Sequence, residues 1–70
     1  MKIEAAAYRI SEWKETIECT PEETERYRAS KTAWEAKNVL EEIVIGHAID
    51  HGGGKWWDEE IRVDYARIVE

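Results

Sequence analysis

Apolar residues in the first segment of the chain recur at steps of three and four positions. Between residues 2 and 18 the apolar stripe consists of Ile3, Ala6, Ile10, Trp13 and Ile17. Glutamates and Arg9 fall off this stripe, as on an amphipathic helix with one face turned to a core. The alanine triplet at 5–7 also favours a helix over a strand. We therefore expect a first helix over about residues 2–18.

A helix start signal follows directly. Thr20 can cap the free amides of a first turn, Pro21 suits the first helical position, and Glu23 can close a capping box. An apolar stripe then continues at steps of four and three through Ala29, Ala33, Ala36, Leu40, Ile43 and His47. The pattern predicts a second helix over about residues 21–48.

The end of this second helix is open between two positions. Residues 43–45 are β-branched and Gly46 could form a left-handed cap, whereas the glycine triplet at 52–54 is the other possible end. If Gly46 ends the helix, residues 43–49 could instead form a buried strand paired with residues 60–69.

The last segment has two interpretations. Asp58 is a plausible helix cap, and a helix over 58–69 would align Trp57, Ile61, Tyr65 and Ile68. Ile61, Val63 and Tyr65 also alternate with Arg62 and Asp64, which is a strand pattern. We expect one small all-α domain over residues 1–70, a three-helix bundle with helices at about 2–18, 21–48 and 58–69. The alternative is an α+β fold with 43–49 and 60–69 as paired strands.

Charge and cysteine usage narrow the possible functions. Sixteen acidic and ten basic side chains give a formal net charge of −6, which disfavours nucleic acid as a direct partner. Cys19 is the only cysteine, so no internal disulfide can form and a reducing compartment is the simplest. No apolar run approaches the roughly 18 residues of a membrane span, and the first residues lack the apolar region of a signal peptide. We expect a cytoplasmic protein that does not bind membranes.

Two histidines suggest the only metal site in the sequence. On a helix, His47 and His51 would project from one face with Asp50 beside them. This set lacks the glutamate of the HExxH motif and supplies few ligands, and histidines beside a glycine loop are more commonly structural or solvated. We expect no cofactor, and metal binding at His47, Asp50 and His51 is a minor hypothesis.

Catalysis has little support in the sequence. The only dense group of titratable side chains is Glu41, Glu42, His47 and Asp50, which is better explained as a solvated acidic face. Lys55 after the glycine triplet lacks the spacing and the hydroxyl residue of a phosphate-binding loop. We therefore expect no enzymatic activity.

Aromatic and acidic residues indicate a protein-binding surface instead. Trp56 and Trp57 are neighbours and cannot both point inward on a regular element, while Trp34 should lie at the edge of the helical stripe. The expected partner-binding residues are Trp56, Trp57, Asp58, Glu59, Glu60, Asp64 and Trp34.

The leading functional hypothesis is a small acidic protein-binding module that blocks a basic surface on a larger protein partner. In size and charge the chain resembles small inhibitors encoded by phages and other mobile elements, some of which present acids in place of nucleic-acid phosphates. The alternative is a structural helical protein that forms homodimers or larger homo-oligomers through the stripes of its helices. The metal-binding helical protein described above is a further alternative.

Overall fold

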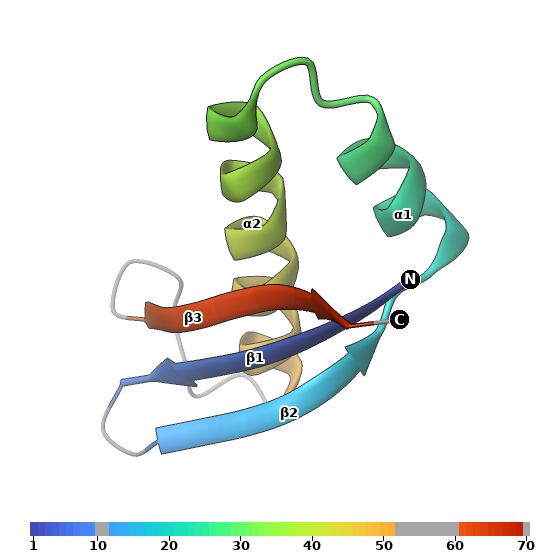
Figure 1. The fold of residues 1–70 in the computed structure, drawn as a ribbon. Helices are drawn as coiled ribbons and strands as arrows, with labels where there is room; N and C mark the ends of the chain where they lie inside the picture. Colours follow the sequence, from blue (N-terminus) through green and yellow to red (C-terminus); the bar gives the residue numbers. More distant parts are fainter. Residues whose placement is uncertain (10–11, 52–60, 70) are drawn as a thin grey trace.

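In the part of the chain that the structure describes, a three-stranded antiparallel sheet is combined with two helices. The computed structural model describes residues 1–9, 12–51 and 61–69. Its elements are β1 (Lys2–Tyr8), β2 (Glu12–Glu18), α1 (Pro21–Arg28), α2 (Ala33–His51) and β3 (Arg62–Val69) (Figure 1). The strand order is β2-β1-β3, and α2 lies across one face of this sheet. The architecture is α+β, so the expected all-α three-helix bundle is wrong.

Residues 2–18 form two strands rather than one helix. β1 and β2 pair antiparallel, with Ile3 opposite Ile17 and Ala7 opposite Trp13. Ile3, Ala5 and Ala7 alternate with side chains on the other face and belong to the buried core. Small residues at positions 5 and 7 let a helix pack close to the central strand. The alanines therefore lie in a strand in this fold, although alanine has a high intrinsic helix propensity.

The predicted start at Thr20 is confirmed. The Thr20 hydroxyl accepts a hydrogen bond from the Glu23 amide at 3.1 Å, and the Glu23 carboxylate accepts one from the Thr20 amide at 2.8 Å. This reciprocal pair is the capping box, with Pro21 at the start of α1.

The predicted helix over 21–48 is divided into two helices. α1 ends at Arg28, and α2 begins at Ala33, where the Thr32 hydroxyl accepts a hydrogen bond from the Glu35 amide at 3.1 Å. α2 then continues through Gly46 to His51. The alternative strand over 43–49 is therefore wrong, because these residues lie in the interior of α2.

The C-terminal segment is a strand in its described part. Residues 58–60 lie outside the described residues, and Arg62–Val69 form β3, so the expected helix over 58–69 is wrong. The strand alternative is confirmed for these residues, but their partner is β1. Ile68 lies opposite Ile3, and the register shifts between Ala6 and Ala7 of β1. Asp64 consequently has no partner residue in β1.

The core lies between the sheet and the C-terminal half of α2. Val44 and Ala48 of α2 are fully buried, as is Ile3 of β1. The same cluster contains Ala5, Ala7, Trp13, Ile17, Ile43 and Ile61. In contrast, α1 contributes no buried residue and, among the described elements, packs only against α2. Within the described residues no helix is long and apolar enough to cross a membrane.

Candidate protein-binding surface

The two helices form a projection that stands away from the core. Figure 1 shows α1 beside the N-terminal half of α2, and the start of α2 extending past the sheet. We call α1 together with residues 33–40 of α2 the helical projection. None of these residues is buried, whereas the buried residues of α2 begin at Ile43. Val39 and Leu40 pack against the core cluster, but most other side chains of the projection are exposed and available to a partner.

Trp34 is the most exposed large apolar side chain among the described residues. It is the second residue of α2, and 73% of its surface is accessible. Tyr8 and Ile68 follow with 47% and 36%. The exposed indole ring is unfavourably hydrated. Its burial against a partner would remove apolar surface from water and would therefore contribute favourable binding free energy. The sequence pattern predicted that Trp34 lies at the edge of the apolar stripe. In the structure it is more exposed than a residue at the edge of a packed face would be.

Trp34 lines a shallow groove between the two helices, which we call the inter-helix groove. Its volume is about 340 Å³, and it is lined by Arg26, Ala29, Ser30, Trp34, Glu35, Asn38, Val39 and Glu42. The Arg26 guanidinium pairs with the Glu42 carboxylate across it. Both groups are more than half exposed, so this pair adds little stability but places a polar rim beside the indole ring.

A second and larger groove lies on the other flank of α2, between this helix and β3. We call it the strand–helix groove. Its volume is about 470 Å³. Its walls are formed by Tyr27 of α1, by Ala33, Ala36, Lys37, Leu40 and Glu41 of α2, and by Val63, Asp64, Tyr65 and Ala66 of β3. Asp64, an expected partner-binding residue, thus lines a different groove from Trp34.

The remaining expected partner-binding residues cannot be placed. Trp56, Trp57, Asp58, Glu59 and Glu60 lie outside the described residues. Their contribution to a binding surface stays a prediction.

The Glu23 carboxylate connects α1 to α2. Besides its capping bond, Glu23 places its second oxygen 3.1 Å from Nε2 of His47 on α2. Partial burial would raise the pKa of the Glu23 carboxyl, but hydrogen bonds from Thr20 and His47 outweigh it, and the pKa lies below its ordinary value of 4.5. Glu23 therefore stays ionised at neutral pH and links α1 to α2.

The predicted metal-binding histidines face different partners. α2 continues past Gly46, so His47 and His51 do lie on one helix, but His47 binds Glu23 while the His51 ring packs 5.8 Å from Trp13. Within residues 1–9, 12–51 and 61–69, no group of three or more His, Cys, Asp or Glu side chains is placed to hold a metal ion.

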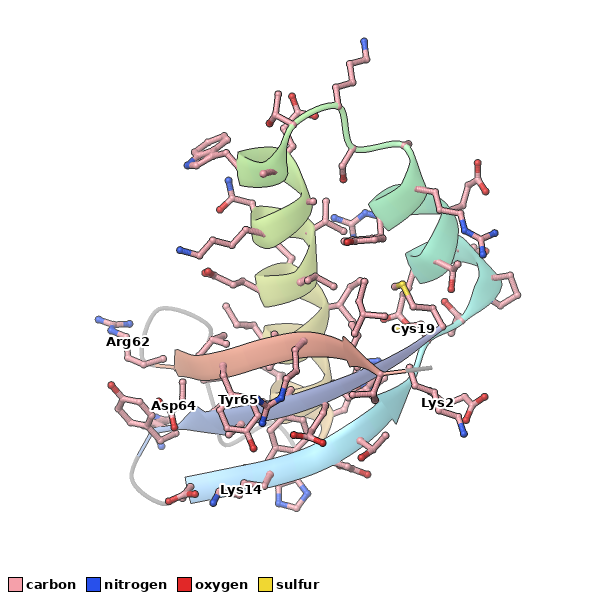
Figure 2. All side chains as sticks on the ribbon, viewed as in Figure 1. Lys2, Lys14, Cys19, Arg62, Asp64 and Tyr65 are labelled. Carbon is pink, nitrogen blue, oxygen red and sulfur yellow. The ribbon has the colours of Figure 1, made fainter. Side chains whose placement is uncertain are left out.

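The face of the sheet opposite α2 carries charged side chains that pair with one another. Arg67 of β3 donates two hydrogen bonds to the Glu4 carboxylate of β1, at 2.6 and 3.0 Å, and its guanidinium lies 4.6 Å from the centre of the Tyr65 ring. The Glu4 carboxylate raises the pKa of Arg67. Figure 2 shows Lys2, Lys14 and Tyr65 on the strands. Paired charges of this kind suit a surface that stays in water.

A second sequence signal for this surface was missed. Thr32 and Glu35 are spaced as Thr20 and Glu23 are, and the Glu35 carboxylate accepts a hydrogen bond from the Lys31 amide at 3.0 Å. Two capping signals so close together indicate two helices. Recognising the second one would have revealed the helix break, and with it the projection that exposes Trp34.

Comparison of the chain with known protein families, with curated proteins and with solved structures found no match.

Proposed function

We propose that this protein is a small acidic protein-binding module that acts by occupying a basic surface on a larger protein partner. The single observation that carries the proposal is Trp34, 73% exposed on a helical projection that contains no buried residue. Tryptophan is enriched among the residues that dominate binding energies, because it buries a large area and loses little conformational freedom.

The net negative charge of the chain supports a partner with a basic surface. A net charge of −6 favours association with a basic surface and speeds encounter with it, especially at low salt. The groove that contains Trp34 is lined by the carboxylates of Glu35 and Glu42 and by the Arg26 guanidinium, which pairs with Glu42. One carboxylate is therefore in excess beside the indole, and it is complementary to a lysine or arginine of the partner. The likeness in size and charge to small inhibitors of the phage or mobile-element type leads us to propose that this contact inhibits the partner, in the cytoplasm.

The direct test is affinity capture from the native host with the natural protein and with Trp34→Ala. A partner that binds through Trp34 should be recovered by the natural protein and lost or strongly reduced with the variant. The affinity for the purified partner should then fall by about tenfold or more, as for truncation of an interface hot spot. It should also weaken as salt concentration rises.

Tyr8→Ala is the matched control, because Tyr8 is also an exposed aromatic residue but lies on β1. Its variant should bind the partner like the natural protein. Equal affinity of Trp34→Ala and the natural protein would refute the proposed surface. The same assay with Trp57→Ala and with Glu59 and Glu60 changed to glutamine measures the predicted contribution of that segment.

A further inference from the structure

The strand–helix groove lies between an edge strand and a helix, two elements that can together bind an extended peptide. One wall is β3, which pairs with β1 on one side and has no described strand on the other. An edge strand presents backbone N–H and C=O groups that can pair with another extended chain. The other wall is a helix, and an edge strand beside a helix is the arrangement in which an extended peptide adds to a sheet and inserts side chains into the intervening groove.

The helix wall leaves room for those side chains. Ala33 and Ala36 are small and do not belong to the core cluster, whereas Leu40 is partly buried, packs against that cluster and also lines the groove. The groove volume of about 470 Å³ is within the range of sites that hold small ligands, about 300–1,000 Å³. On the strand wall Val63 and Ala66 add apolar surface. An occupant would therefore gain both strand pairing and apolar contacts.

Charge determines what the occupant can be. The groove is lined by two carboxylates, Glu41 and Asp64, and one ammonium group, Lys37. Lys37 lies 3.8 Å from Glu41, which is a weak exposed pair. The excess of negative charge favours a basic side chain on the occupant. A second copy of this chain is disfavoured, because two molecules of charge −6 repel one another.

The other edge of the sheet does not offer the same opportunity. β2 has the sequence Glu-Trp-Lys-Glu-Thr-Ile-Glu, in which Glu15 is exposed although it lies opposite the buried Ala5. Charged residues that point inward on an edge strand are a known protection against strand addition. Neither groove described above is lined by β2. The two edges of the sheet therefore differ, because β3 lines the strand–helix groove and β2 lines neither groove.

We propose that the strand–helix groove binds an extended segment of a partner protein as a fourth strand beside β3, with apolar side chains alternating with at least one lysine or arginine. The apolar side chains lie against Ala36 and Leu40 of α2. The basic side chain lies between Glu41 and Asp64. This site deepens the proposed function, since it requires a protein partner, but it does not use Trp34.

The test starts with a displayed library of random peptides about twelve residues long, selected on the natural protein. Enriched peptides should alternate apolar residues with lysine or arginine. A synthetic copy of the most enriched peptide should protect amides of Arg62–Val69 from hydrogen exchange, because strand addition covers that edge. Its affinity should fall about tenfold or more in Ala36→Trp, which fills the groove, and in Glu41→Lys combined with Asp64→Lys.

Glu25→Lys is the charge control, since Glu25 is exposed on α1 and lines neither groove. Trp34→Ala and Glu25→Lys should each bind the peptide with an affinity within about twofold of that of the natural protein. Failure of the Trp34 surface and failure of the strand–helix groove can therefore be told apart. Three outcomes would overturn the proposal. They are no enriched peptide, peptides that bind the natural protein and both groove variants equally, and a natural protein that sediments as a dimer with β3 amides already protected.

Discussion

The two halves of α2 have opposite roles in the same helix. From Ile43 onward the helix packs on the sheet, and Ile43, Val44 and Ala48 are buried. From Ala33 to Leu40 it has no buried residue, and its side chains line grooves on both flanks. One element thus anchors the fold at one end and presents a binding surface at the other.

If the two halves of α2 differ in this way, the largest change in the free energy of unfolding is expected at Ile43, in the half that packs on the sheet. Ile43→Ala should lower the free energy of unfolding by about 2–5 kcal/mol, because it removes buried methyl groups and leaves a cavity. Since a domain of this size has a net stability of only a few kcal/mol, the variant should be largely unfolded by circular dichroism at 37 °C. A stability loss below about 1 kcal/mol would show that this half of α2 is not an anchor.

The junction between the halves should have an intermediate effect. Glu23→Ala removes hydrogen bonds to Thr20 and His47, and it should lower the free energy of unfolding by about 1–2 kcal/mol at pH 7 in urea titrations. Because the pKa of Glu23 is lower in the folded state, its contribution is present above about pH 4.5 and is lost as pH falls through the folded-state value. The difference between the natural protein and the variant should therefore shrink in acid. A difference that grows in acid would contradict this assignment.

Gly46 gives a smaller effect of the opposite sign. It lies in the interior of α2, is exposed, and a Cβ built there would meet nothing within 4 Å. Gly46→Ala should raise the free energy of unfolding by about 0.5–1 kcal/mol, because alanine loses less backbone entropy in a helix. Thermal unfolding measures the change. Destabilisation by this substitution would mean that α2 is interrupted at Gly46.

The smallest effect on stability is expected at Trp34, in the presenting half. Trp34→Ala should change the free energy of unfolding by less than about 0.5 kcal/mol, since the side chain is 73% exposed. Chemical denaturation followed by far-ultraviolet circular dichroism avoids the loss of the tryptophan signal. A loss above about 1.5 kcal/mol would place Trp34 in the packing of the fold and weaken its proposed role in binding.

The helix start at Thr20 could be predicted because a capping box is a local arrangement of side chains and neighbouring amides. The strand β3 could be predicted as one of two interpretations, because Arg62 and Asp64 alternate with apolar residues. The β1–β2 pair was missed for a physical reason. Pairing places Ile3 opposite Ile17, and their separation of fourteen positions is also close to four turns of a helix. Periodicity alone could not distinguish the two.

Local composition reinforced that error. Tyr8, Arg9, Ile10 and Ser11 contain none of the glycine, asparagine or aspartate residues typical of a tight hairpin turn. The position of the grooves could not be predicted either, because it depends on β3 lying beside β1 and on the break between α1 and α2. The exposure of Trp34 followed only in part from its place at the edge of the stripe.

The strand order also determines when the fold can be completed. β1 comes first in the chain but lies at the centre of the sheet, and its second neighbour, β3, comes last (Figure 1). During synthesis, β1, β2 and both helices emerge while one edge of β1 still lacks its partner. That edge stays open until residues 62–69 leave the ribosome, because no earlier described strand can replace β3. Completion of the sheet therefore waits for residues 62–69, and the groove beside β3 forms only once they have paired with β1.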